Sequence, residues 1–257
     1  MARRSGSILE RIGHRSTLKR WRAAVLGAAE ADLPRLRKQR KQARRLRHHL
    51  NELLYIAENR LALPAIDSNA ISAPHDSDWI WRPELWRGPL PIPGLVSVET
   101  GAQMGAELTV FHDCAESELT LRQLRNTRKS DLAPFGVRMD VFRFDGSYLS
   151  VALDLPEQAV DGLTRAHVIR MEFLIEMERP LEIFARLNIK SGPNTEKIVR
   201  ELPLTSGDRH VEFDLAYSKM NEKRIDKAWI DLIFEGPQMN QVVMRDLTFS
   251  RRLRAQI

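Results

Sequence analysis

A phenylalanine, a histidine, an aspartate and a cysteine follow one another in FHDC, residues 111–114. A cysteine beside a histidine could act as a nucleophile with its base, but such partners usually lie far apart in sequence. Successive side chains of a strand point to opposite faces, so His112 and Cys114 share one face and Asp113 lies on the other. We expect a buried thiol and a hydrogen-bonded histidine here rather than a catalytic pair.

A second stretch, HDSD at residues 75–78, offers side chains that bind hard cations. A calcium loop needs several more oxygens in a fixed geometry, and the sequence that follows supplies none. The single cysteine excludes an intrachain disulfide and a multi-cysteine zinc site. The sequence contains no glycine-rich phosphate loop and no nucleophile elbow. We therefore expect no metal site and no cofactor.

Carboxylates are frequent in segments whose alternation predicts strands: Glu172, Glu176, Glu178, Glu182, Asp231 and Glu235. Two carboxylates in a cleft, one with a raised pKa, could hydrolyse a glycosidic bond. However, Arg186, Lys190 and Arg200 lie on neighbouring predicted strands, where cross-strand ion pairs explain the carboxylates without catalysis. A carboxylate-dependent enzyme acting on glycosides therefore stays as an alternative to a non-catalytic protein.

One outward row of side chains is suited to binding sugars. Alternation in KAWIDLIFE and EIFARLNIK places aromatic and planar polar groups on the same side of two predicted strands. An aromatic ring stacks on a sugar, and carboxylate, guanidinium and amide groups bind hydroxyls. The candidate ligand-binding residues are Trp229, Asp231, Glu235, Phe184, Arg186 and Asn188. The competing interpretation is that Trp229 and Phe184 receive the helical segment or the tryptophan-rich connection of the same chain.

The elements that would position this row follow from a hydrophobic period of two, which begins near residue 107. Residues 135–155 predict a hairpin with a positive-φ turn at Asp145-Gly146, and residues 170–190 predict another around Arg179-Pro180. With the other alternating segments we expect nine or ten strands and no long helix. Residues 105–257 therefore predict a mainly β fold, an antiparallel β-sandwich of jelly-roll type.

Residues 1–62 predict a basic α-helical segment. Apolar side chains recur at alternating spacings of three and four at Leu36, Ala43, Leu46, Leu50, Leu53 and Ala57. Such a seam needs a partner, either an upstream helix in a hairpin or a second copy in a coiled coil. Gly13 and Ser16 are expected to break the upstream helix into pieces. We expect a homo-oligomer through residues 33–61 as one outcome.

Charge divides the chain in the same way. Residues 1–60 hold 16 Lys and Arg against 5 Asp and Glu, a net charge of +11, whereas residues 61–257 carry −5. A membrane surface or a nucleic acid could bind such a helix, although no aromatic residues are interleaved for base stacking. The candidate contacts to an anionic partner are Arg37, Lys38, Arg40, Lys41, Arg44, Arg45 and Arg47.

Residues 63–104 form a Pro- and Trp-rich connection that we expect to pack on the β domain. No stretch is apolar enough to predict an integral membrane segment. The short run AAVLGAAEA is too weak and too far from the start to indicate a signal peptide. The expected location is the cytoplasm, with the basic helix at the membrane periphery as an option.

The segments WRPELWRGPL, RPLEIFARLNI and VEFDLAYSKMNEKRIDKAWIDLIFEGPQMNQVVMRDLTFSRR resemble a family of bacterial proteins described as a domain of unknown function. That resemblance implies no activity. The closing WIDLIFE and VVMRDLTFSRR are similar to the last strands of jelly-roll carbohydrate-binding modules, which implies a fold and not a function. We predict a non-catalytic binding module that recognises a glycan or polysaccharide, with the basic helix mediating association. The alternative is a scaffold at a membrane surface or on nucleic acid.

Overall fold

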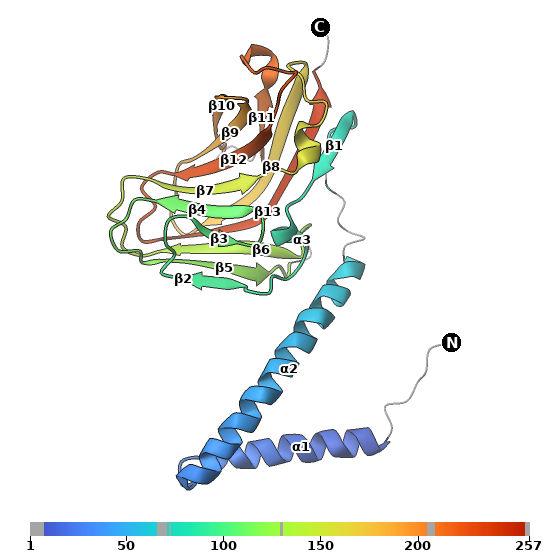
Figure 1. Ribbon diagram of the computed structural model, residues 1–257, viewed down its shortest axis with the longest axis vertical. Coiled ribbons are helices and arrows are strands. Elements are labelled where there is room, and N and C mark those ends of the chain that lie inside the picture. Colours follow the sequence, from blue (N-terminus) through green and yellow to red (C-terminus); the bar gives the residue numbers. More distant parts are fainter. Residues whose placement is uncertain (1–7, 66–70, 72, 129–130, 205–208, 255–257) are drawn as a thin grey trace. The chain divides into compact units, whose positions relative to one another are not determined.

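The computed structural model describes residues 8–65, 71, 73–128, 131–204 and 209–254. The chain divides into two compact units, residues 1–57 and 58–257. The first is helical and the second holds the strands (Figure 1). Each unit is described by itself.

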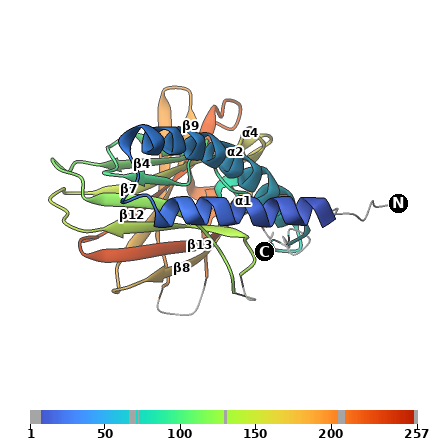
Figure 2. The same cartoon turned by 90° about the horizontal axis from the view of Figure 1, so that it is seen from below.

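Two antiparallel sheets make up the second unit. The seven-stranded sheet has the order β11 (His210–Asp214), β8 (His167–Met177), β13 (Asn240–Leu253), β6 (Phe135–Val141), β5 (Leu119–Arg125) and β2 (Gly94–Val96), with β1 (Ser77–Trp81) paired to β13. The six-stranded sheet has the order β10 (Asn194–Glu201), β9 (Ile183–Ser191), β12 (Lys227–Phe234), β7 (Leu149–Asp154), β4 (Leu108–His112) and β3 (Ala102–Met104). In Figure 2, β4 and β7 belong to one layer of the sandwich, and β13 and β8 belong to the other. The predicted mainly β sandwich is confirmed.

The core lies between the sheets because one face of nearly every strand is apolar. Leu121 and Val137 from one sheet, and Val151, Leu187 and Ile230 from the other, are fully buried. Alternate residues of β9 and β12 point away from this core, as the period of two requires. The outward residues of the six-stranded sheet are therefore free to form a separate surface.

The two predicted hairpins are wrong. β6 belongs to the seven-stranded sheet and β7 to the six-stranded one, and β8 and β9 are divided in the same way. Residues 142–148 thus cross from one sheet to the other, and Gly146 does not have the positive φ expected of a tight hairpin turn. Repeated crossing between layers is the jelly-roll pattern, in which neighbours in sequence are often not neighbours in a sheet.

Short helices occur within the sandwich unit: α3 (Glu84–Arg87), α4 (Glu157–Val160) and the 3₁₀ turn η2 (Leu215–Tyr217). α3 carries Trp86, which is fully buried and donates its indole N–H to the Met244 carbonyl at 3.0 Å. Trp79 and Trp81 stack at 6.3 Å, and Trp81 packs on Phe249 at 5.6 Å between ring centroids. The tryptophans of the connection therefore pack against β13, in the seven-stranded sheet.

A buried ion pair fixes the connection further. The Arg82 guanidinium, 2% exposed, donates from Nε and Nη2 to the two carboxylate oxygens of Asp246, both at 2.8 Å. Burial raises the pKa of the Asp246 carboxyl, although the hydrogen bonds from Arg82 act in the opposite direction. Asp246 follows a bulge in β13, where the register with β8 shifts after Met244.

The helical unit contains α1 (Ile8–Leu26) and most of α2 (Leu33–Ala65). The expectation that Gly13 and Ser16 break the first helix is wrong, because α1 runs through both; single Gly and Ser residues cost helix stability without ending a helix. Leu46, Leu50 and Leu53 of α2 are 37%, 48% and 60% exposed, so the seam is open in the single chain. No helix among the described residues is long and apolar enough to cross a membrane.

Candidate functional site

The outward row predicted from sequence lies on two neighbouring strands of the six-stranded sheet. β9 and β12 pair antiparallel, with Asp231 opposite Arg186 and Trp229 opposite Asn188. Residues that are opposite in a ladder point to the same face, so these four side chains lie together. We call this surface the outer face of the six-stranded sheet.

Its centre is a charged group with fixed geometry. Arg186 donates to Asp231 Oδ2 from Nε at 3.0 Å and from Nη2 at 2.7 Å, and Asn188 Nδ2 donates to the same oxygen at 2.9 Å. Asp231 is 5% exposed and Asn188 1%, which is unusual on an outward face. Asp231 Oδ1 and Arg186 Nη1 take part in no hydrogen bond with the described residues. One acceptor, Asp231 Oδ1, and one donor, Arg186 Nη1, are therefore not used by these hydrogen bonds.

Aromatic rings lie on both sides of this polar centre. Trp229 is half-buried two residues before Asp231, and Phe184 is half-buried two residues before Arg186 on the antiparallel strand. Because the strands run in opposite directions, the two rings lie at opposite ends of the Arg186–Asp231 pair. Lys227 Nζ lies 5.0 Å from the centroid of the Trp229 ring.

Small and polar residues of β7 continue the face. Ala152 lies opposite Asp231, Ser150 opposite Ile233, and Asp154 opposite Trp229. Ala152 and Ser150 are each 8% exposed, although their side chains are short and point outward. The side chains on this face are thus short on β7 and longer on β9 and β12.

Five of the six predicted ligand-binding residues come together in this way, and Glu235 does not. β12 ends at Phe234, and Glu235 is exposed beyond it, with its backbone N–H donating to the Glu182 carbonyl. The predicted binding residues did not include Lys190, Lys197 and Lys227 of the same face. Alternation alone places Lys190 in the row of Phe184 and Lys227 in the row of Trp229, whereas Lys197 joins them only through the register of β10 with β9.

The FHDC stretch is structural. His112 is buried; its Nε2 is 2.8 Å from the Val98 carbonyl oxygen and its Nδ1 accepts the Cys114 N–H at 3.2 Å. Burial raises the pKa of the Cys114 thiol, which opposes its use as a nucleophile. Asp113 accepts from the Ser147 hydroxyl and from the N–H groups of Ser147 and Tyr148. Both ring nitrogens of His112 therefore have hydrogen-bond partners within the protein.

The residues of the HDSD stretch do not converge on a common site. His75 and Asp76 are exposed, whereas Asp78 accepts from Arg251 Nε at 3.0 Å and Nη2 at 2.9 Å. Burial raises the pKa of Asp78, but the Arg251 guanidinium outweighs it and holds that pKa below its usual value. Among the residues that the structure describes, no group of three or more His, Cys, Asp or Glu could hold a metal ion.

Three of the six strand carboxylates considered for catalysis, Glu172, Glu176 and Asp231, are engaged in ion pairs. Glu176 binds Arg128 and Arg245, and Glu172 lies 2.8 Å from Arg170 Nη2. Burial raises the pKa of Glu176, but its hydrogen bonds to the two arginines lower that pKa below its usual value overall. A general acid needs a raised pKa, which is the opposite of the shift at Glu176.

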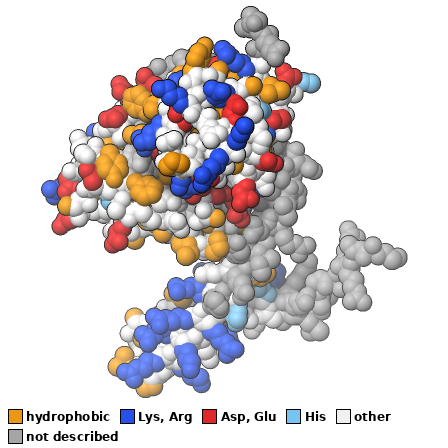
Figure 3. All heavy atoms as spheres, turned by 45° about the horizontal axis from the view of Figure 1, so that its top comes forward, with side chains coloured by type: hydrophobic (Ala, Val, Ile, Leu, Met, Phe, Trp, Pro, Cys, Tyr) orange, Lys and Arg blue, Asp and Glu red, His pale blue; other side chains and the backbone are white. Residues whose placement is uncertain are grey.

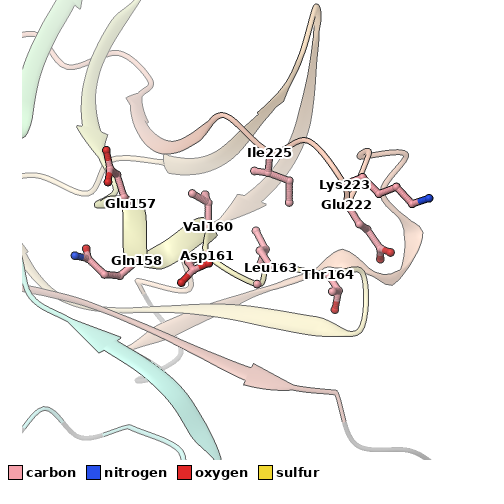
Figure 4. A pocket seen from close by; sticks show the side chains of 10 residues that line it. Glu157, Gln158, Val160, Asp161, Leu163, Thr164, Glu222, Lys223 and Ile225 are labelled. Atoms are coloured by element: carbon pink, nitrogen blue, oxygen red, sulfur yellow. The ribbon is translucent and has the colours of Figure 1, made fainter.

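A pocket of about 580 Å³ opens beside α4 (Figure 4). Val160, Leu163 and Ile225 lie in its middle, with Glu157 at one side and Glu222 at the other. Glu222 already accepts the Arg165 N–H at 2.6 Å, which lowers the pKa of its carboxyl. Apart from Leu163, the side chains here are exposed or half-exposed, and they include no aromatic ring. The residues that line the pocket include no hydrogen-bonded polar group comparable to Arg186, Asp231 and Asn188 on the outer face.

The basic residues of α2 form a second candidate surface. All seven predicted contacts, from Arg37 to Arg47, are exposed. Figure 3 shows blue Lys and Arg side chains covering much of the visible helical segment. None of the seven is in an ion pair within the described part of the chain. Among the described residues, the positive charge of these seven side chains is therefore not neutralised by an ion pair.

The chain belongs to the family of unknown function DUF6478, whose sequence model matches residues 1–257. No curated protein matches the sequence.

Among solved structures, an enzymatically active tailspike domain of bacteriophage CBA120 is 8% identical with a TM-score of 0.40, covering 62% of this chain and 21% of its own. The family 11 carbohydrate-binding module of Clostridium thermocellum Lic26A-Cel5E is 12% identical with a TM-score of 0.39, covering 62% and 95%. The same family's module in complex with a mixed-linked tetrasaccharide gives 13% and 0.36, covering 63% and 97%. At these scores none of them assigns an activity to this chain.

Proposed function

We propose that the protein is a non-catalytic glycan-binding module and that the outer face of the six-stranded sheet is its binding site. The observation that carries this proposal is the hydrogen-bonded Arg186–Asp231–Asn188 group, with Asp231 and Asn188 buried, between two half-buried aromatic rings. Sugar hydroxyls both donate and accept hydrogen bonds, so Asp231 Oδ1 can accept from one and Arg186 Nη1 can donate to another. Because the group is held by three hydrogen bonds, little ordering is needed on binding.

The aromatic rings supply the apolar part of recognition. Trp229 and Phe184 supply aromatic rings on which the C–H side of a sugar ring can stack. The tryptophans of the connection pack against the other sheet, so they do not occupy this surface. These features support a sugar-binding face that the tryptophans of the connection leave uncovered.

A glycan array that spans neutral and acidic oligosaccharides tests the proposal. We expect wild-type protein to bind a subset of glycans, Trp229→Ala to lose that binding, and Tyr217→Ala to retain it. Tyr217 is a suitable control because it is 82% exposed on η2, away from β9 and β12. Trp229→Phe keeps a ring and should bind more weakly than wild type. No binding by the wild type, or equal binding by folded Trp229→Ala, contradicts the proposal.

A second function is favoured by the basic surface of α2, namely peripheral binding to an anionic membrane. Seven exposed Lys and Arg share one helix with exposed leucines, as in helices that lie in a membrane interface. Vesicles of phosphatidylserine and phosphatidylcholine should co-sediment the protein, and pure phosphatidylcholine vesicles should not. Filter binding to single-stranded DNA at two salt concentrations is the comparison. Retention by DNA with no vesicle binding would favour the nucleic-acid alternative instead.

A further inference from the structure

Three lysines gather at the Trp229 end of the outer face. Lys190 of β9 lies directly opposite Lys227 of β12, and Lys197 of β10 lies opposite Asn188. All three are exposed. Like charges directly opposite in a ladder destabilise the sheet. An arrangement of this kind costs folding free energy unless an anion lies between the lysines.

No carboxylate of the described residues neutralises them. Asp226, the nearest acid in sequence to Lys227, accepts the Gly192 N–H at 3.0 Å and lies 4.0 Å from Arg224 Nε. Asp154 lies across Trp229 on β7, on the side away from β9 and β10. Asp231 is already held by Arg186 and Asn188, and Glu201 of β10 lies opposite Phe184, at the other end of the face. The lysines therefore leave an unneutralised positive area on the β9–β10 side of the tryptophan.

The position of Lys227 ties this charge to the stacking ring. Its Nζ lies 5.0 Å from the centroid of the Trp229 ring. A sugar stacked on Trp229 would therefore carry its substituents next to an ammonium group, with Lys190 opposite on the neighbouring strand. An anionic substituent there accepts charge-assisted hydrogen bonds, which are roughly twice as strong as neutral ones.

We propose that the glycan recognised at the outer face is anionic, with a carboxylate or a sulfate ester bound by Lys190, Lys227 and Lys197 beside Trp229. This inference rests on the proposed function and names the class of glycan. Trp229 and the Arg186–Asp231 pair hold the sugar ring, and the lysines select the charge. Because the lysines are exposed, their contribution falls as salt screens them, with a Debye length of about 10 Å at 0.1 M.

The test compares polygalacturonate, its fully methyl-esterified form and a sulfated galactan by isothermal titration calorimetry. Esterification removes the charge and keeps the backbone. We expect each anionic polymer to bind at least about tenfold more tightly than the ester, a difference of about 1.4 kcal/mol. Comparing the affinities for the sulfated galactan and for polygalacturonate shows whether a sulfate ester or a carboxylate is preferred. Lys190→Gln/Lys227→Gln should lower the affinity for the anionic polymers about tenfold, and lower the affinity for the ester by less than that.

The matched control is Lys219→Gln/Lys223→Gln, which removes the same charge from two exposed lysines outside the face. This control variant should bind the anionic polymers like wild type, because the proposal requires positive charge beside Trp229 rather than on the protein as a whole. Equal affinity for the ester and the anionic polymers, or equal losses in the two double variants, overturns this inference and leaves glycan binding intact. Failure of the proposed function itself has a different signature, which is no Trp229-dependent binding of any glycan on the array.

Discussion

At the residue scale, Asp231 is a carboxylate that the sheet could not bury without partners. Its Oδ2 accepts three hydrogen bonds from Arg186 and Asn188, which offset the loss of hydration. These side chains are then fixed before any ligand arrives. Such pre-organisation is what a binding face needs and what a solvated strand surface lacks.

Asp231→Ala should therefore destabilise the protein as well as weaken glycan binding. The substitution leaves the Asn188 amide and the Arg186 guanidinium without their shared acceptor, at a cost of about 1–3 kcal/mol. Urea unfolding followed by tryptophan fluorescence measures it. Glu235→Ala, at an exposed position just beyond the same strand, should stay within about 0.5 kcal/mol of wild type. Equal effects of the two substitutions would show that the hydrogen bonds to Asp231 are dispensable.

Glu176 should make stability depend on pH. Its folded-state pKa lies below the usual value of 4.5: burial alone would raise it, but the hydrogen bonds from Arg128 and Arg245 lower it more. A carboxyl with a lowered folded-state pKa stabilises the fold above its unfolded pKa, and this stability is lost as the pH falls through the folded value. The free energy of unfolding of wild type should exceed that of Glu176→Gln at pH 7, and the difference should shrink below pH 4.5. A constant difference from pH 7 to pH 3 would contradict this assignment.

At the element scale, the bulge in β13 requires a glycine on the neighbouring strand. A Cβ at Gly136 of β6 would meet the Met244 carbonyl oxygen at 2.9 Å and Arg245 Cα at 3.2 Å. Asn126 closes the same region by donating to the carbonyls of Ala133, Phe135 and Arg245. The bulge that places Asp246 against Arg82 is therefore packed on β6 without spare room.

Gly136→Ala should cost about 1–3 kcal/mol, because backbone atoms rather than flexible side chains must move. Thermal unfolding followed by circular dichroism measures the loss. Gly94→Ala is the matched control on β2 of the same sheet, where the nearest atom to the added Cβ is the Leu121 carbonyl oxygen at 3.6 Å. That substitution should be nearly neutral, and a comparable loss in both variants would argue against a specific clash.

The alternation of residues predicted correctly which side chains of a strand point outward, but not which strands pair with each other. The difference has a physical reason. Which side chains of β12 point outward depends only on the local period of two, so Trp229 and Asp231 could be assigned correctly from sequence. Which strand lies beside β12 depends on pairing between segments far apart, and Asp231 and Arg186 are 45 residues apart. The same limit explains why β6 and β7 were predicted as a hairpin although they lie in different sheets.

At the scale of the whole molecule, the open leucine seam of α2 predicts association between copies. Leu46, Leu50 and Leu53 are more than a third exposed, and burying them against a second copy would be favourable. The basic side chains around them repel each other, so added salt should strengthen the association. Sedimentation equilibrium at 0.1 M and 0.5 M salt, between which the Debye length falls by roughly half, measures both effects.

The full chain carrying Leu46→Glu/Leu50→Glu should remain monomeric under these conditions. Val25→Glu/Leu26→Glu, which changes two exposed apolar residues of α1, is the control and should associate like wild type. A wild-type protein that is monomeric at both salt concentrations would contradict the association of residues 33–61.

The central claim is that the outer face of the six-stranded sheet binds a glycan, and hydrogen–deuterium exchange of the full chain with and without galacturonate oligosaccharides tests it most directly. Binding should slow exchange in peptides covering Ile183–Ser191 and Lys227–Phe234, with a smaller effect in Asn194–Glu201. Peptides from the pocket beside α4 and from β13 should not change. Protection confined to residues 157–164 and 222–225, or no protection at saturating oligosaccharide, would contradict the assignment of the site.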